Sequence, residues 1–174
     1  DTIWQNVQRM RVNRRRRYRY SDVNFYLLQK VVETKNGVGL DKYLTNHFYN
    51  SLHLRNLGYN PRKRIVPQRT IPTTNDTRWR QQLLQGYVHD ETAAIQGGVG
   101  GNAGLFSNAN DLAILFQMLL NGGHYGGRQY LNKNTIEYFT AKNYGSHRGL
   151  GFDKPHTGRK KGAFARSASL KTFG

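Results

Sequence analysis

The sequence of 174 residues is long enough for one domain with a hydrophobic core of its own. It contains no run of eighteen apolar residues, so no membrane-spanning helix is expected, and the absence of cysteine excludes disulfides and thiolate metal sites. With 27 basic against 10 acidic residues, the formal net charge of +17 would attract polyanions.

The positive charge is concentrated in three clusters, at residues 9–19, 62–69 and 159–161. Two interpretations of these clusters stay open: a surface that binds nucleic acid or an anionic glycan, and solvated loops whose acidic partners lie outside this sequence. No RNP, helix-turn-helix or zinc-finger pattern accompanies the clusters. The six histidines are scattered, so we expect neither a metal nor another cofactor.

The first half of the chain predicts three helices. Residues 2–10 favour a short helix with one apolar side, formed by Ile3, Trp4, Val7 and Met10. A longer helix, capped by Ser21 and Asp22, is expected to end near Glu33, with an apolar face of Val23, Tyr26, Leu27 and Val31. The third begins at Leu40, and its apolar residues recur at helical spacing as Leu40, Tyr43, Leu44 and Phe48.

Residues 58–77 predict an irregular segment, because three prolines exclude long helices there: Pro61, Pro67 and Pro72. This segment is the expected place for an internal boundary or a mobile excursion. The next residues, 79–84, are compatible with a short helix or with an extended segment.

A glycine-dense loop then runs into a further helix at about residues 109–121. Four of the seven residues 98–104 are glycine, which indicates a tight, packed turn rather than a flexible linker. Ser107 or Asn108 can cap the helix, and Asp111 suits its positive end. The predicted apolar stripe is Leu112, Leu115, Phe116 and Leu119, and residues 121–123 (Asn-Gly-Gly) end the helix.

Another short helix is predicted from Asn132 or Asn134 to about Ala141, with Ile136, Tyr138 and Phe139 on its apolar face. Residues 149–152 and 163–166 favour short strands around a basic turn at 156–162. The elements together predict a mainly α fold with short β segments.

Tyr20 and Asp22 are the candidates for chemistry that the residues themselves suggest. The positive end of a helix favours a phenolate, and a neighbouring lysine would lower the phenol pKa further, so Tyr20 could act as a general base for a serine. Tyr20 could equally be a packing residue, and Asp22 a helix N-terminal charge.

Four segments, in order, resemble motifs of the serine β-lactamase and penicillin-binding-protein-like hydrolases. Residues 18–33 resemble "YSNxxYxLLGxIIE", and residues 40–52 resemble "PLDxYVxxxIFxPLGM". Residues 87–94 are similar to "G-x-VHDxxA", and residues 98–123 are similar to "GGxAGLxSTAxDLAxFxxMLLNGG". The resemblance is to the branch related to class C β-lactamases, in the form found in Bacteroidetes-type bacteria.

The resemblance implies the helical subdomain of a β-lactamase/transpeptidase-like α/β fold, incomplete here, with residues 1–174 as a single partial domain. Residues 1–141 would be the helical region, and residues 149–174 would start the return to the sheet. Tyr20 would be the general base, and Asp22, where Asn is common in the family, would hold substrate or the lysine. The residues implied to shape the cleft are His89, Asp90, Gly100, Gly101 and Asn102, while Gly98 and Gly104 would serve backbone geometry.

Two motifs of the family are missing from this sequence. Residues 1–19 contain no serine, so no Ser-x-x-Lys precedes Tyr20. His156-Thr157-Gly158 resembles the Lys/His-Thr/Ser-Gly motif, but Pro155 and the basic residues after Gly158 suit an exposed turn better than a strand. The sequence begins with Asp1 rather than Met and shows no signal peptide, and we expect it to be a piece of a longer protein.

The resemblance therefore predicts part of a hydrolase that acts through an acyl-enzyme on ester, amide, peptide or β-lactam-type substrates. The piece would be inactive alone because its nucleophile is absent. It would show an exposed apolar patch where the missing sheet packs, which a dimer could cover. The alternative is a non-catalytic basic module that binds a polyanion or cell-wall polymer. The resemblance places the whole protein in the bacterial periplasm or cell envelope.

Overall fold

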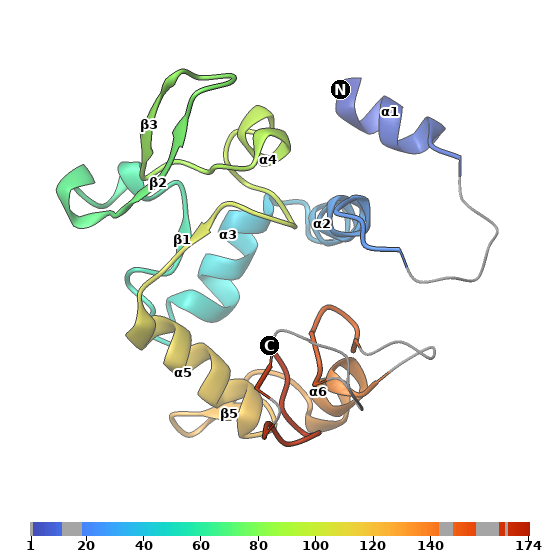
Figure 1. The fold of residues 1–174 in the computed structure, drawn as a ribbon. Coiled ribbons are helices and arrows are strands. Elements are labelled where there is room, and N and C mark those ends of the chain that lie inside the picture. Colours follow the sequence, from blue (N-terminus) through green and yellow to red (C-terminus); the bar gives the residue numbers. More distant parts are fainter. Residues whose placement is uncertain (1, 12–18, 143–147, 156–163, 166) are drawn as a thin grey trace. The chain divides into compact units, whose positions relative to one another are not determined.

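The computed structural model describes residues 2–11, 19–142, 148–155, 164–165 and 167–174 (Figure 1). The described chain is rich in helix with a few short strands. This agrees with the mainly α fold with short β segments that the sequence predicted. It divides into two compact units, residues 1–112 and residues 113–174, and each is described by itself. The division therefore falls inside a helix and not in the 58–77 segment where the sequence suggested a boundary.

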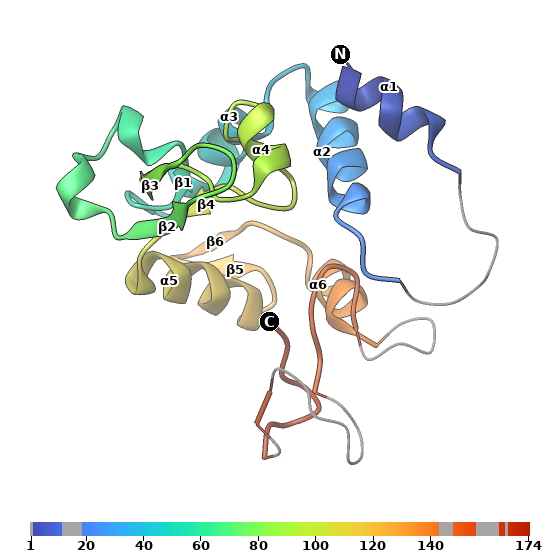
Figure 2. The same cartoon turned by 45° about the horizontal axis from the view of Figure 1, so that its top comes forward.

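The first unit contains most of the elements. Its helices are α1 (Thr2–Arg9), α2 (Val23–Asn36), α3 (Leu40–Leu44), which continues into a π-helical turn (Thr45–Tyr49), and α4 (Glu91–Ile95). Its strands are β1 (Gly58–Tyr59), β2 (Pro72–Asp76), β3 (Gln82–Gln85) and β4 (Leu105–Phe106), with 3-10 turns at Pro61–Lys63 and Pro67–Arg69. Figure 2 shows the same elements from a second direction. The three helices predicted in the first half of the chain are confirmed.

Helix α2 runs three residues beyond its predicted end. Gly37 ends it in the left-handed conformation with φ 70°, and its N–H donates to the carbonyl of Glu33. The predicted apolar face is wrong in part: Tyr26 is buried, but Leu27 and Val31 are 46% and 51% exposed. The second buried residue of α2 is Gln29, because the glycine-dense loop packs on that side of the helix and bonds to its amide.

The β2–β3 hairpin replaces part of the segment that the sequence predicted as irregular. The two strands pair antiparallel from Pro72 opposite Gln85 to Asp76 opposite Gln82, with an irregularity between Pro72 and Thr74. Of the two alternatives for residues 79–84, the extended one is therefore correct for residues 82–84, which lie in β3. Leu84, only 2% exposed, is the apolar side chain by which β3 joins the core.

Helix α5 (Ala109–Leu120) begins in the first unit and ends in the second. Asn108 caps it, since its Oδ1 accepts from the Asp111 N–H at 2.8 Å. Asp111 is only 3% exposed. Its carboxylate accepts hydrogen bonds from the backbone N–H groups of Asn56 (2.7 Å) and Leu57 (3.0 Å). This places a buried charge where the start of α5 meets the 52–57 segment.

The second unit begins with the rest of α5 and the hairpin of β5 (His124–Tyr125) and β6 (Arg128–Gln129). Gly126 and Gly127 form its turn with φ of 55° and 80°, which is the turn chemistry that a two-residue hairpin requires. Helix α6 (Lys133–Thr140) follows, capped by Asn132, whose Oδ1 accepts from the Asn134 N–H. On α6 only part of the predicted apolar face is buried: Ile136 is 7% exposed, but Tyr138 and Phe139 are 57% and 44% exposed.

The predicted strand at 149–152 is wrong, because the chain bends at residues 150–151 and the Gly149 N–H donates to the carbonyl of Phe152. Within the predicted strand at 163–166, residues 164 and 165 are described and neither lies in a strand. Asp153 and Gly174 exchange backbone hydrogen bonds, as antiparallel neighbours do, although no strand extends from them in the described residues. The basic turn at 156–162 and the His156-Thr157-Gly158 triplet lie outside the described residues.

Candidate functional site

Tyr20 lies three residues before α2 and is 67% exposed. The start of the helix is held by Ser21, whose Oγ accepts from the Val23 N–H at 3.3 Å. Asp22 occupies the N-cap position, and its backbone carbonyl accepts from the N–H groups of Phe25 and Tyr26. Its carboxylate makes no capping bond, so the prediction that the Asp22 side chain caps α2 is wrong. The half-buried carboxylate is thus not used by the helix end.

A glutamine joins the middle of α2 to the glycine-dense loop. Gln29 is 6% exposed, and its Oε1 accepts from the Gly101 N–H at 2.8 Å while its Nε2 donates to the Val99 carbonyl at 3.2 Å. The same Nε2 donates to Glu33 Oε1, which also accepts from the Leu40 N–H at 3.2 Å. One hydrogen-bond network, with the buried Gln29 at its centre, therefore ties α2, the loop and the start of α3 together.

The glycines of the loop are required by close packing. A Cβ on Gly101 would collide with the backbone carbonyl of Phe25 in α2, and a Cβ on Gly100 would lie 2.9 Å from that of Ala93. Gly104 has φ 103° and lies so close to the Gly98 carbonyl that a Cβ would be 2.6 Å from its oxygen. The loop backbone can lie against α2 only because these side chains are absent.

Tyr59 of β1 holds the loop from the other side. Its hydroxyl donates to the Gly100 carbonyl at 3.1 Å. Burial, and secondarily the charge of Asp41, raises the pKa of Tyr59 to about 12, so the phenol stays protonated and keeps donating. β1 pairs antiparallel with β4 at the end of the loop, with Tyr59 opposite Leu105, which fixes where the chain leaves the loop.

Asn102 lies at the tip of the loop and is half-buried. Its Oδ1 is buried and has no hydrogen-bond donor among the described residues. A Cβ on Gly100 would lie 2.8 Å from this oxygen, so the missing side chain of Gly100 also makes room for it. A buried acceptor without a donor costs about 1–3 kcal/mol, which is typical of a position that serves something other than stability.

His89 and Asp90, which the resemblance implies to shape the cleft, have different structural roles. Asp90 caps α4, and its Oδ1 accepts from the Ala93 N–H at 2.7 Å. The His89 side chain is exposed, and the His89 carbonyl accepts from Arg80 Nη2 at 2.6 Å. Asp90 therefore fixes where α4 starts, while the imidazole of His89 faces a surface pocket.

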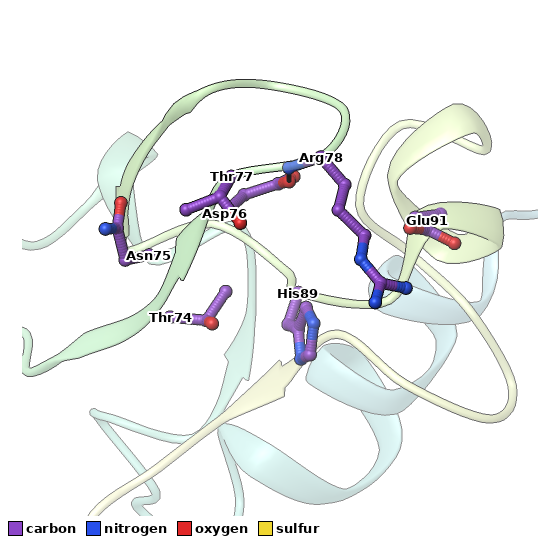
Figure 3. Close-up of a pocket in the computed structure, with 7 residues that line it drawn as sticks. All are labelled: Thr74, Asn75, Asp76, Thr77, Arg78, His89 and Glu91. Atoms are coloured by element: carbon purple, nitrogen blue, oxygen red, sulfur yellow. Dashed lines mark hydrogen bonds between the residues drawn. The ribbon is translucent and has the colours of Figure 1, made fainter.

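That pocket, of about 260 Å³, lies between the β2–β3 hairpin and the start of α4 (Figure 3). Its lining side chains are polar or charged: Thr74, Asn75, Asp76, Thr77, Arg78, His89 and Glu91. Figure 3 shows the Arg78 side chain extending from the hairpin loop toward the start of α4, where His89 and Glu91 lie.

Arg80 fixes the walls of the pocket relative to each other. Its Nε contacts Asp76 Oδ2 at 2.7 Å, and Nη1 and Nη2 donate to the carbonyls of Val88 (2.8 Å) and His89 (2.6 Å). Asp76 Oδ1 accepts from the N–H groups of Arg78 and Trp79. These backbone bonds, Trp79 first, and the Arg80 side chain hold the pKa of Asp76 well below its usual range.

The described part of the 62–69 basic cluster is partly structural. Arg62 Nε donates to the Gln85 carbonyl at 2.6 Å, and Arg64 donates to the carbonyls of Arg55 (2.7 Å) and Asn56 (3.2 Å). Burial lowers the pKa of Arg64, against the opposing charge of Asp111. Much of the 9–19 cluster and all of 159–161 lie outside the described residues.

Neither a metal centre nor a membrane span is found in the part of the chain that the structure describes. Its Asp, Glu and His side chains form no group of three that could hold a metal ion. None of its helices combines the length and apolar character needed to cross a bilayer.

A model of the Beta-lactamase family matches residues 1–164. The chain belongs to the beta-lactamase family. It is 38% identical over 168 residues to an Escherichia coli K12 protein named "Putative D-alanyl-D-alanine carboxypeptidase", covering 89% of this chain and 39% of that protein. It is 40% identical over 134 residues to the Bacillus subtilis 168 protein named N-acetylmuramyl-L-alanine amidase, covering 70% of this chain and 30% of that protein.

The fold agrees with this assignment. A crystal structure from Bacteroides dorei DSM 17855, described as a "putative beta-lactamase", aligns with a TM-score of 0.55 at 15% identity, covering 79% of this chain and 38% of that one. The resemblance inferred from the four motifs is therefore confirmed at the level of family and fold. The chain spans about two-fifths of the length of the E. coli relative that it matches.

Sequence reasoning found the glycine-dense loop but missed the residues that hold it, Gln29 and Tyr59. A signal for Gln29 was present, since a glutamine three residues after the buried Tyr26 lies on the same helix face. The Arg80–Asp76 pair also had a sequence signal, because opposite charges stand four residues apart. Their contact with residues 88–89 depends on the hairpin and had no such signal.

Proposed function

We propose that this chain is part of a serine hydrolase that acts through an acyl-enzyme on ester, amide or β-lactam-type substrates, with Tyr20 as the general base. The observation that carries the proposal is the exposure of Tyr20, 67%, directly before α2 in a chain of the beta-lactamase family. A packing tyrosine would be buried, whereas a base must reach solvent and substrate.

In this role the Tyr20 oxygen takes the proton of the serine hydroxyl as that hydroxyl attacks the substrate carbonyl. It then gives the proton to the leaving group, and it repeats both steps with a water molecule when the acyl-enzyme is hydrolysed. Asp22 lies two residues on, and its uncapped carboxylate is available to hold substrate or a lysine. Gly100, Gly101 and Asn102 would shape the cleft, and the Oδ1 of Asn102 is buried there without a donor among the described residues.

The nucleophile has to come from another part of the protein. These 174 residues contain no Ser-x-x-Lys. The E. coli and B. subtilis relatives are each more than twice as long as the region that this chain matches. The chain alone is expected to be unreactive toward serine-directed acylating probes.

The apolar surface of α2 supports the same interpretation. Leu27, Leu28 and Val31 are 46%, 58% and 51% exposed on one helix. Contiguous apolar surface of this kind marks an interaction site. In the longer protein we expect the missing sheet to cover it, and in the isolated chain a second copy could do so.

A fluorophosphonate probe tests the proposal. The full-length parent should be labelled and the 174-residue chain should not. In the parent, Tyr20→Phe should slow labelling by about 10²–10⁴-fold because it removes the proton acceptor. Tyr138→Phe, at another exposed tyrosine, is the matched control and should label at the wild-type rate. Labelling of the isolated chain, or equal rates for the two variants, would contradict these roles.

The alternative function, binding of a polyanion or cell-wall polymer, is supported by the net charge of +17. Against it, two arginines of the 62–69 cluster bond to backbone carbonyls and serve the fold. Filter binding of an anionic polymer across a salt series separates the two functions. A polyanion site gives saturable binding with a steep log–log decrease of affinity with salt, and a hydrolase piece without such a site gives no saturable binding to the polymer.

A further inference from the structure

We propose that the pocket between the β2–β3 hairpin and α4 is a subsite for the carboxylate-bearing end of a short peptide. Pockets that enclose a whole drug-sized ligand run from about 300 to 1,000 Å³. This pocket, at about 260 Å³, has room for one terminal group of a larger ligand.

The pocket is built before any ligand arrives. Arg80 connects the hairpin to residues 88–89 through two hydrogen bonds, of 2.8 and 2.6 Å, and its third bond, of 2.7 Å, goes to Asp76 within the hairpin. The side chains of Arg80 and Asp76 are only 12% and 8% exposed. The Asp90 cap fixes α4. Preorganised walls lower the ordering cost of binding.

The pocket side chains that are not used in the Arg80 bonds determine which ligand chemistry fits. Arg78 offers a guanidinium fork, which matches a carboxylate in shape and charge. Thr74 and Thr77 line the same wall and add hydroxyl donors, and His89 faces them from the 88–89 segment (Figure 3). The negative charge of Asp76 is compensated by Arg80 at 2.7 Å, so it opposes an incoming anion only weakly.

Glu91 distinguishes a peptide end from a simple anion. It is an acceptor on the α4 side of the pocket, where a phosphate or sulfate would be repelled. In a peptide end, amide N–H groups lie within a few ångströms of the carboxylate, so one ligand can satisfy Arg78 and Glu91 together. A metal ion fits less well, because the described residues form no three-ligand group here.

This inference does not depend on the serine chemistry, and it is tested by binding alone. ¹H–¹⁵N NMR titration of the 174-residue chain compares N-acetylglycylglycine with its C-terminal carboxamide. The carboxylate form should produce saturating shifts at residues 74–78 and 89–91, and the carboxamide should bind about tenfold more weakly or not at all. Inorganic phosphate, titrated alone, should bind more weakly than the carboxylate peptide.

Variants locate the effect. Arg78→Gln should weaken binding of the carboxylate form about tenfold, whereas Arg69→Gln, at an exposed arginine outside the pocket, should leave it unchanged. Equal binding of carboxylate and carboxamide, phosphate binding as tight as the peptide, or equal affinities of the two variants would overturn the proposal. The comparison of the two peptides needs no variant, so it decides even where a variant misfolds. Fluorophosphonate labelling of the parent is a separate measurement, so either proposal can fail alone.

Discussion

The glycine-dense loop and the β2–β3 hairpin are two loops of one unit that are held in opposite ways. The loop is fixed by buried bonds from Gln29 and Tyr59 and by direct contact of Gly101 with the α2 backbone. The hairpin is held at its turn by Arg80, and the neighbouring side chains of Asn75, Thr77 and Arg78 stay exposed. The loop therefore serves as a scaffold whose backbone has one allowed geometry, and the hairpin serves to present side chains.

The largest effect is expected at the tightest contact of the loop. Gly101→Ala places a methyl group against the Phe25 carbonyl, so either α2 or the loop has to move. Overpacking of this kind costs about 3 kcal/mol of unfolding free energy. Urea unfolding followed by circular dichroism measures the change.

Gly126→Ala is the matched control for that substitution. Gly126 has φ 55° but nothing within 4 Å of an added Cβ, so only the left-handed backbone penalty of about 1 kcal/mol applies. A loss at position 101 no greater than at position 126 would show that the loop is not packed against α2.

A smaller loss is expected when the polar anchor is removed and the glycines are kept. Gln29→Ala leaves the Gly101 N–H and the Val99 carbonyl without their partner, at about 2 kcal/mol. The exposed Gln117 of α5, whose Nε2 donates to Asn121 Oδ1, is the control, and its alanine variant should lose less than about 0.5 kcal/mol. Hydrogen exchange at Gly101 should accelerate in the Gln29 variant alone, and an unchanged rate there would contradict the anchoring role.

The same contrast explains what the sequence could predict about the fold. Periodicity located α2, α5 and α6, and residue chemistry narrowed the caps of α5 and α6 to two candidates each, because these features depend on neighbours along the chain. The structure selects Asn108 and Asn132 from those candidates. Pairing of β1 with β4 joins residues about 47 positions apart and has no local signal beyond two residues per strand. The apolar pattern of α2 misled for a related reason, since Leu27 and Val31 are exposed among the described residues, although local periodicity alone predicts burial for them.

The candidate site divides in the same way. The motifs located Tyr20 and the loop, and the four glycines were correctly interpreted as packing residues from their density alone. The pocket beside His89 could not be predicted, because Arg80 makes it by reaching carbonyls eight and nine residues away, beyond a hairpin in a segment that the sequence predicted as irregular. Side-chain to backbone bonds of this kind depend on geometry and leave no residue pattern.

Acid should weaken the hairpin before the loop. The pKa of Asp76 is lower in the folded chain than the ordinary value of about 4. The carboxylate therefore contributes stability that is fully present at pH values above about 4. That contribution is lost as the pH falls below about 4 toward the folded-state pKa. The protection factors for amide hydrogen exchange at residues 82–89 should therefore fall on acidification more than the protection factor at Gly101.

Asp76→Asn tests the origin of this acid sensitivity. The variant cannot gain a proton at that position, so its melting temperature should be lower than the wild-type value at pH 7 and should approach it as the pH falls below about 4. Glu137→Gln breaks only the exposed Lys133–Glu137 contact of 3.7 Å, and surface pairs of this type contribute about 0–1 kcal/mol, so its pH profile should parallel that of the wild type. If the profile of Asp76→Asn also stays parallel to the wild type, the carboxylate does not hold the hairpin, and the pocket walls depend on the two Arg80 bonds to backbone carbonyls instead.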